Sequence, residues 1–198
     1  ISEHAVAIDF GNGDQPVPKA DAADRDKATD FGGALHRLCQ LDAMAGADVA
    51  SARFDAVADA YKVGDRGRLR SAFRRWLASD VRREARDHIW VQPELPFQAR
   101  MGAVTLQGEI DLFCAEGPVA ESADTRAFVV DYKTGGHPQE TAGQLHAKHR
   151  LQALCYAYAV LQQGFSEVSF AFVRVEQEDP LKPGQPQVVR YRFRKRSI

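Results

Sequence analysis

Cysteine is scarce in this chain, and the few cysteines are not paired as metal clusters require. Among 198 residues, Cys39, Cys114 and Cys155 are the cysteines, and none belongs to a Cys-x-x-Cys pair. An odd number of widely separated cysteines argues against a zinc site or an iron–sulfur cluster built from this chain alone. We therefore expect no iron–sulfur cluster, and we expect the three thiols to be buried and reduced.

An excess of one charge and long apolar runs are also missing. The 26 Lys and Arg oppose 27 Asp and Glu, which gives a formal net charge of −1. Any surface for nucleic acid must therefore be a local patch. No apolar run is long enough to span a membrane, and the opening residues lack the features of a secretory signal. The chain also lacks an initiator Met, and we expect it to be a fragment of a longer polypeptide.

The first third of the chain changes from irregular to helical. Residues 1–30 are rich in Asp, Ala, Gly and Pro without periodicity, which predicts an irregular N-terminal arm. The spacing of Phe31, Leu35 and Leu38 then predicts a helix with Asp30 as its N-cap. Two further helices are predicted after it, at 51–62 and 66–88.

One face of the predicted helix at 66–88 is rich in arginine. Because arginine is a good helix former, a solvated surface is the default interpretation of such a face. The alternative is that the guanidinium groups follow a phosphate backbone, with Arg70 and Arg74 as DNA contacts. The arginines of this face are Arg68, Arg70, Arg74, Arg75, Arg82, Arg83 and Arg86.

Beyond residue 89 the hydrophobic period changes to two, which is typical of strands. A helix is predicted over 144–163, with Leu151, Leu154, Cys155 and Tyr158 on its apolar side. The last two strands are expected to enclose a loop rich in Pro and Gly. The strands are predicted at 90–101, 104–114, 127–133, 167–177 and 187–195. This order predicts an α/β fold with a central mixed β-sheet flanked by helices, plus an N-terminal helical part.

Two of these strands carry charges where apolar residues should continue. Strict alternation places Ile110 and Leu112 on one face and Asp111 on the other, while Asp131 and Lys133 share a face of the next strand. If the strands pair, two carboxylates and one ammonium lie together. Carboxylates at that range repel unless a cation lies between them, and such oxygen ligands suit Mg²⁺. A salt bridge across the strands would satisfy the same residues without a metal, so the spacing alone leaves both interpretations open.

Five short motifs follow one another in a characteristic order. Together they resemble the PD-(D/E)xK nuclease signature and, more specifically, the RecB-family nuclease domain of bacterial helicase–nucleases. The resemblance covers residues 31–198 and implies a restriction-endonuclease-like core. The motifs are GGALHRLCQ at 32–40, PELPFQAR at 93–100, LQGEIDLF at 106–113, VVDYKTG at 129–135 and HRLQALCYAYAV at 149–160.

The resemblance implies a metal-dependent active site. His36, Asp111, Asp131 and the backbone carbonyl of Tyr132 would hold the catalytic divalent metal. Lys133 would orient or activate the attacking water and stabilise developing negative charge. The implied cofactor is Mg²⁺, with Mn²⁺ as a substitute and Ca²⁺ as an ion that binds without supporting catalysis.

Three further residues receive roles from the same motifs. Glu94 would have a supporting catalytic role, and Gln152 and Tyr156 would line the site and contact DNA because they share a helical face. Each has a structural alternative when taken alone. A single His36 beside an apolar stripe is more often a hydrogen-bonded core residue, and Gln152 and Tyr156 could simply belong to the packed side of their helix.

The function implied is that of an Mg²⁺-dependent deoxyribonuclease, an exonuclease, in the bacterial cytoplasm and associated with the nucleoid. Its expected partners are DNA, as single strands or ends, the helicase portion of the same polypeptide and a second helicase–nuclease subunit. The context would be DNA end resection in recombinational repair. Two alternatives are a catalytically inactive DNA-binding or scaffold domain of the same fold and a stand-alone Cas4-like exonuclease. No nucleotide-binding P-loop occurs in these residues to support a helicase directly.

Overall fold

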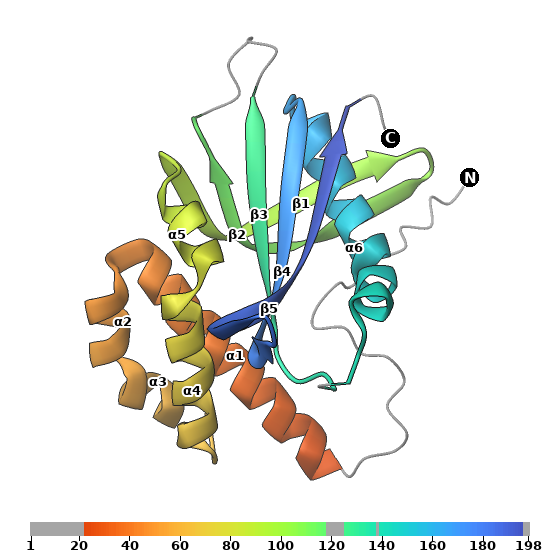
Figure 1. The fold of residues 1–198 in the computed structure, drawn as a ribbon. Helices are drawn as coiled ribbons and strands as arrows, with labels where there is room; N and C mark the ends of the chain where they lie inside the picture. The colour runs from red at the N-terminus through yellow and green to blue at the C-terminus, as the bar shows by residue number, and fades with distance from the viewer. Residues whose placement is uncertain (1–21, 118–124, 138, 196–198) are drawn as a thin grey trace.

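The computed structural model of the chain describes residues 22–117, 125–137 and 139–195 (Figure 1). The helices in these residues are α1 (Ala22–Ala45), α2 (Ala47–Ala52), α3 (Phe54–Ala60), α4 (Arg66–Ala78), α5 (Asp80–Arg86) and α6 (Ala142–Gln162). The strands are β1 (Trp90–Met101), β2 (Val104–Ala115), β3 (Arg126–Lys133), β4 (Glu167–Asp179) and β5 (Lys182–Arg194).

The strands form one mixed sheet in the order β1-β2-β3-β4-β5. Neighbouring strands are antiparallel except β3 and β4, which are parallel and are connected by α6. A parallel pair needs such a crossover because a short turn cannot return the chain to the start of the next strand. The predicted α/β fold, with a central mixed sheet, flanking helices and an N-terminal helical part, is confirmed.

Two hydrophobic clusters lie on opposite faces of the sheet. Figure 1 shows α6 apart from the group formed by α1–α5. Helices α1, α4 and α5 cover one face, where Leu35 and Trp76 pack with Phe128 and Tyr132 of β3, and α2 and α3 pack on α1. Helix α6 covers the other face, where Val129 of β3 is buried. Because its alternate residues enter different clusters, β3 is buried on both faces, and this explains its continuous apolar sequence.

Helix α1 begins earlier than the sequence predicts. It starts at Ala22, so Asp30 lies inside the helix, and the prediction of Asp30 as the N-cap is wrong. Alanine, lysine and arginine, which occur in the residues before Asp30, are good helix formers. The apolar stripe that begins at Phe31 is buried, as predicted. Residues 1–21 of the predicted arm lie outside the described residues.

Both other helices predicted in the N-terminal part are interrupted. The predicted helix at 51–62 is replaced by α2 and α3, which meet at Arg53, and the one at 66–88 is replaced by α4 and α5, which meet at Ser79. Ser79 has an extended backbone, and its hydroxyl accepts a hydrogen bond from the Arg82 N–H at 3.0 Å. A serine within an amphipathic repeat can therefore end one helix and cap the next.

The C-terminal part also departs from the pattern. Strand β4 reaches Asp179 and β5 starts at Lys182, so most of the segment predicted as a loop is strand. Leu151 of α6, predicted on the packed side, is 67% exposed. All three cysteines are buried free thiols. Within the described part of the chain, we find no helix with the length and apolar character needed to cross a membrane.

Candidate active site

The candidate site lies where β2 separates from β3. The ladder between these strands runs from Ala115 and Ala127 to Leu112 and Val130 and then ends. Asp111 and Asp131 are therefore the first residues beyond it. Strand β2 continues in pairing with β1 alone, and this hairpin turns toward α6 (Figure 1). The separation opens backbone and side chains that a continuous sheet would cover.

A break in strand alternation directs Asp111 into this opening. Ile110 packs on the α6 side of the sheet and Leu112 packs under the helices, so the prediction that they share a face is wrong. Opposite the break, Glu94 has a φ of 50° and falls between the paired positions of the β1–β2 ladder. Such irregularities, in which a non-glycine residue is held at positive φ, re-aim side chains next to functional sites.

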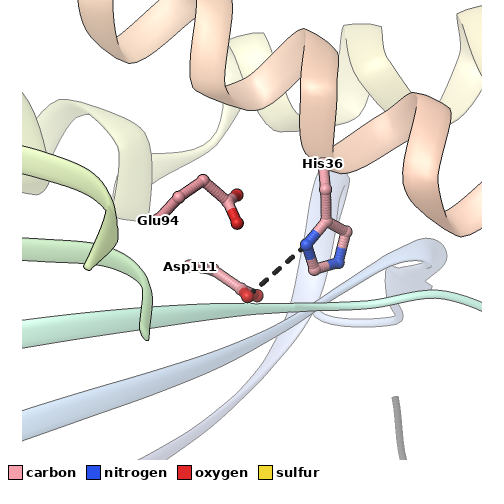
Figure 2. A group of neighbouring side chains, drawn as sticks. All are labelled: His36, Glu94 and Asp111. Atoms are coloured by element: carbon pink, nitrogen blue, oxygen red, sulfur yellow. Dashed lines mark ion pairs between the residues drawn. The ribbon is translucent and has the colours of Figure 1, made fainter. Parts of the chain in front are cut away.

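Three side chains from three elements converge at the opening. His36 of α1, Glu94 of β1 and Asp111 of β2 each offer one donor atom, and these atoms all lie within 4.8 Å of one another (Figure 2). His36 Nδ1 lies 3.4 Å from Asp111 Oδ1. His36 Nε2 is buried and has no hydrogen-bond partner among the residues that the structure describes. We call these residues the His36–Glu94–Asp111 group.

The group fits a divalent cation by the chemistry of its donors. Carboxylate oxygens are the ligands that Mg²⁺ and Mn²⁺ prefer, and an imidazole nitrogen is a common ligand of other divalent transition metals. Among the described residues, this is the set of His, Cys, Asp and Glu side chains with the spacing of a metal site. Glu94, predicted in a supporting role, thus takes a place in the group. Asp131, predicted as a ligand, does not belong to it.

Asp131 is held by a different set of contacts. Lys133 Nζ lies 2.8 Å from Asp131 Oδ1, and the side chain of Gln152 donates a hydrogen bond to Asp131 Oδ2 at 2.9 Å. Lys133 and Asp131 form an ion pair without hydrogen-bond alignment, and within the described part of the chain Asp131 Oδ1 has no hydrogen-bond partner. The Asp131 carboxylate therefore already has a counter-charge within the protein.

Tyr132 connects the two sets. Its backbone N–H donates to Asp111 Oδ2 at 2.7 Å, and its ring meets the His36 ring edge-to-face with centroids 5.6 Å apart. Its backbone also forms a hydrogen bond that favours protonated His36. The predicted metal ligand, the Tyr132 carbonyl, therefore belongs to a residue that positions two members of the His36–Glu94–Asp111 group.

The pKa values of the three side chains of the group are shifted because they are buried and because carboxylates lie close to one another. Burial raises the pKa of Asp111 well above its usual range, and Asp131 raises it further. Burial, a hydrogen bond with Glu109 and then Asp111 raise the pKa of Glu94 to about 8. Burial lowers the pKa of His36, although Asp131 and Glu94 oppose this. A cation at the group would relieve the repulsion among these carboxylates.

The two predicted DNA contacts on α6 have different surroundings. Gln152 lines the site through its bond to Asp131. Tyr156 is only 2% exposed, and its hydroxyl donates to the Glu109 carbonyl at 3.1 Å and accepts a hydrogen bond from Gln152. Tyr156 therefore braces Gln152 against β2, and its burial gives no support to a DNA contact.

The arginines of α4 and α5 mostly contact the protein itself. Arg70 lies over the ring of Phe54 at 4.1 Å and forms an ion pair with Asp55 at 3.6 Å. Arg74 is exposed, and the structure shows no ion pair for it among the described residues. Other arginines of this face pair with acidic residues, as in Arg68–Glu176, Arg82–Asp42, Arg83–Asp80 and Arg86–Asp42.

Sequence reasoning missed two residues near Lys133. His149 of α6 stacks on Phe172 of β4 with centroids 5.0 Å apart, and Lys133 Nζ lies 5.5 Å from the centre of the same Phe172 ring. Burial and the neighbouring Lys133 lower the pKa of His149 to about 4. The sequence could have indicated His149 by its spacing, because it lies one helical turn before Gln152 and therefore on the same side of the helix.

Comparison with known proteins agrees with this geometry. No curated protein matches the chain. The family described as the PD-(D/E)XK nuclease superfamily matches residues 11–195, which include every helix and strand described above. The mixed sheet with flanking helices is consistent with the restriction-endonuclease-like fold of that superfamily. The chain therefore belongs to the PD-(D/E)XK nuclease superfamily.

Proposed function

We propose that this domain is an Mg²⁺-dependent nuclease that hydrolyses phosphodiester bonds of DNA. The observation that carries the proposal is the convergence of the His36–Glu94–Asp111 group beside the ion pair of Lys133 and Asp131. Membership of a nuclease superfamily supports the same reaction class. The ligand set and the lysine are both present, which disfavours an inactive scaffold.

The metal site proposed is the His36–Glu94–Asp111 group, with Asp131 and the Tyr132 carbonyl as additional ligands implied by the resemblance. Mg²⁺ would be the working ion, Mn²⁺ would substitute and Ca²⁺ would bind without supporting catalysis. A bound divalent cation would supply Lewis-acid stabilisation of the negative charge that develops on the phosphate.

The chain's own residues would position the other reacting groups. Lys133 keeps only 12% of its side chain exposed, and Asp131 fixes its ammonium at 2.8 Å. An ammonium fixed before the reaction can hold a water molecule and stabilise charge in the transition state without reorganising. Gln152 donates a hydrogen bond to the other oxygen of Asp131, which restricts rotation of the carboxylate that pairs with Lys133.

The wider context is proposed from the five sequence motifs alone. They resemble the RecB family, in which this domain follows a helicase, so we propose an exonuclease that resects DNA ends for recombinational repair in the bacterial cytoplasm. The proposed partners are DNA, the helicase portion of the same polypeptide and a second helicase–nuclease subunit. A stand-alone Cas4-like exonuclease is disfavoured because the sequence has no matching cysteine set.

A cleavage assay with defined variants tests the chemistry. The purified protein should cut linear single-stranded DNA with Mg²⁺ or Mn²⁺ and should not cut it with Ca²⁺ or a chelator. Asp111→Asn and Lys133→Met should each lower the rate by at least about 100-fold, the scale of removing one preorganised charged group. Asp48→Asn, at an exposed carboxylate of α2, is the matched control and should cut normally.

Two results would overturn the proposal. One is cleavage by Lys133→Met at the wild-type rate. The other is a folded wild-type protein that shows neither metal-dependent cleavage nor saturable Mn²⁺ binding by calorimetry, which would favour the scaffold. Circular single-stranded DNA in the same assay distinguishes an exonuclease, which leaves it intact, from an endonuclease.

A further inference from the structure

The segment between β3 and α6 connects residues of the proposed reaction. Lys133 is the last residue of β3, and α6 begins at Ala142 and carries Gln152. Both side chains contact the carboxylate of Asp131. The path of residues 134–137 and 139–141 therefore affects how Lys133 and Gln152 meet at Asp131.

A buried arginine of β4 lies against this segment. Arg174 pairs with Lys133 in the parallel ladder, and its side chain is only 3% exposed. Its guanidinium donates to Glu140 Oε2 at 2.6 Å, to the His137 carbonyl at 3.2 Å and to the side chain of Gln187. A buried guanidinium is tolerated only with such partners, and its planar fork fixes the directions in which they lie.

Glu140, the partner of Arg174, also forms hydrogen bonds with the turn after β3 and with α6. Its Oε2 also accepts a hydrogen bond from the His137 N–H at 3.0 Å. Its Oε1 accepts from Lys148 Nζ of α6 at 3.0 Å. One carboxylate therefore connects Arg174, the turn after Lys133 and the second turn of α6.

The backbone of the turn is shaped around the guanidinium. Gly136 has a φ of +85°, and a Cβ at this position would collide with Arg174 Nη2. The neighbouring Gly135 N–H donates to Glu176, and the side chain of Gln177 reaches the Gly136 carbonyl at 3.3 Å. The turn after Lys133 is thus in close contact with three polar or charged residues of β4, Arg174, Glu176 and Gln177.

We infer that Arg174 is a positioning residue for Lys133 and Gln152, and this inference rests on the proposed function. Arg174 contacts neither Asp131 nor any member of the His36–Glu94–Asp111 group in the described structure. It acts by holding the turn that follows Lys133 and leads into α6, which carries Gln152. Lys133 and Gln152 are the two residues that contact the Asp131 carboxylate. Turnover should therefore depend on Arg174, whereas metal binding should not.

Arg174→Lys is the first test because it keeps the charge and removes the fork. With Mg²⁺ and single-stranded DNA, kcat should fall by about 10- to 100-fold, because a displacement of about 1 Å at a catalytic group has that effect. KM and the Mn²⁺ dissociation constant measured by calorimetry should stay within about twofold. Hydrogen–deuterium exchange of peptides over 134–137 should accelerate at least about tenfold.

The matched control is Arg190→Lys. Arg190 of β5 also forms a two-point contact with a glutamate, Glu84, and among the described residues its contacts are with Glu84 and the ring of Phe128 and not with the turn. This variant should leave kcat and the exchange of 134–137 unchanged. If Arg174→Lys does not fold, Glu140→Gln replaces it, since Gln keeps the size of the side chain and removes the charge. The same readouts, in the same direction, are then expected.

A double-mutant cycle tests the contact without any enzymatic readout. Gly136→Ala should lower the midpoint of thermal unfolding less in an Arg174→Met background than in the wild type, because only the unfavourable φ then remains. Strictly additive midpoints would overturn the contact.

The remaining outcomes separate this inference from the proposed function. If the wild type neither cleaves DNA nor binds Mn²⁺ saturably, the proposed function fails, and accelerated exchange over 134–137 with a non-additive cycle still shows the role of Arg174 in holding the turn. If the wild type cleaves and Arg174→Lys has an unchanged kcat, the inference is overturned. It is equally overturned if kcat, KM and Mn²⁺ affinity all decline together, since that is the pattern of general destabilisation.

Discussion

The two halves of the site handle buried charge in opposite ways. The half built on β3 and α6 places Asp131 between an ammonium and an amide, so its carboxylate has a counter-charge inside the protein. The half built on α1, β1 and β2 brings Asp111 and Glu94 together with a histidine whose pKa is lowered. The second half therefore has excess negative charge whenever its acids ionise.

This difference indicates which half depends on a cation from outside. A buried carboxylate with an ammonium at 2.8 Å needs no metal to be stable. Carboxylates crowded against each other rise in pKa, as Asp111 and Glu94 do, unless a cation is added. Metal binding should thus be decided mainly by the His36–Glu94–Asp111 group, while the ion pair of Asp131 and Lys133 is a fixed part of the fold.

The largest expected effect is a difference in sign between two similar substitutions. In metal-free solution, Asp131→Asn should lower the free energy of unfolding by about 3 kcal/mol, because it removes the counter-charge of Lys133, whose side chain is only 12% exposed. Asp111→Asn should leave it unchanged or raise it by about 1 kcal/mol, since it removes repulsion and its amide oxygen can still accept the Tyr132 N–H. Urea unfolding in the presence of a chelator measures both values. Equal losses would show that the two halves do not differ as argued.

A smaller effect concerns pH. The pKa of Glu94 is about 8 in the folded protein and near 4.5 in the unfolded chain, so between these values the folded state binds more protons. Without metal, the free energy of unfolding should therefore decrease as the pH rises from 5 to 8.5. Glu94→Gln should flatten this dependence.

Saturating Mn²⁺ should reverse the sign of the pH dependence, because ligands must lose their protons to bind a metal. Denaturant midpoints at several pH values, with Mn²⁺ and with chelator, give the comparison. A wild-type stability that rises with pH in chelator would contradict the charge state assigned to this half. Asp48→Asn, which removes an exposed carboxylate from α2, is the control and should keep the wild-type slope.

The β3 half of the site was easier to predict from the sequence than the β1–β2 half. An apolar run that ends in Asp131 and Lys133 gives both the strand and the shared face, and the structure places them in contact. The β1–β2 half depends on a break in alternation at Asp111 and on the positive φ of Glu94. Strict period-two reasoning cannot locate such a break, because it depends on how the hairpin packs against α6.

Hydrophobic periodicity also predicts the helices only in part, for a reason that differs from that for the strands. Periodicity identified the buried stripe of α1 and the presence of a helix at α6, although Leu151, which the pattern places on the packed side of α6, is exposed. It did not separate α4 from α5, because the cap at Ser79 interrupts the backbone without interrupting the apolar stripe. Contacts between distant segments, such as Arg174 with Glu140, have no signature in one sequence.

The smallest expected effect distinguishes two arginines of one helix. Arg70 is engaged with Phe54 and Asp55, whereas Arg74 is exposed with no ion pair in the described residues. Arg70→Gln should lower the free energy of unfolding by about 0.5–1 kcal/mol and leave DNA affinity nearly unchanged. Arg74→Gln should leave stability unchanged. If α4 faces DNA, it should also weaken binding about two- to threefold at 50 mM salt and less at 200 mM, as expected for a single phosphate contact.

Fluorescence anisotropy with labelled single-stranded DNA, in Ca²⁺ to prevent cleavage, measures the affinity of both variants. A loss for Arg74→Gln that shrinks with added salt would assign α4 to the nucleic-acid surface. The same loss at both salt concentrations would instead point to a structural role for Arg74. No loss at either would leave the arginine-rich face as a solvated surface that stabilises the helical side of the domain, because its charges are satisfied by neighbours such as Asp42 and Glu176.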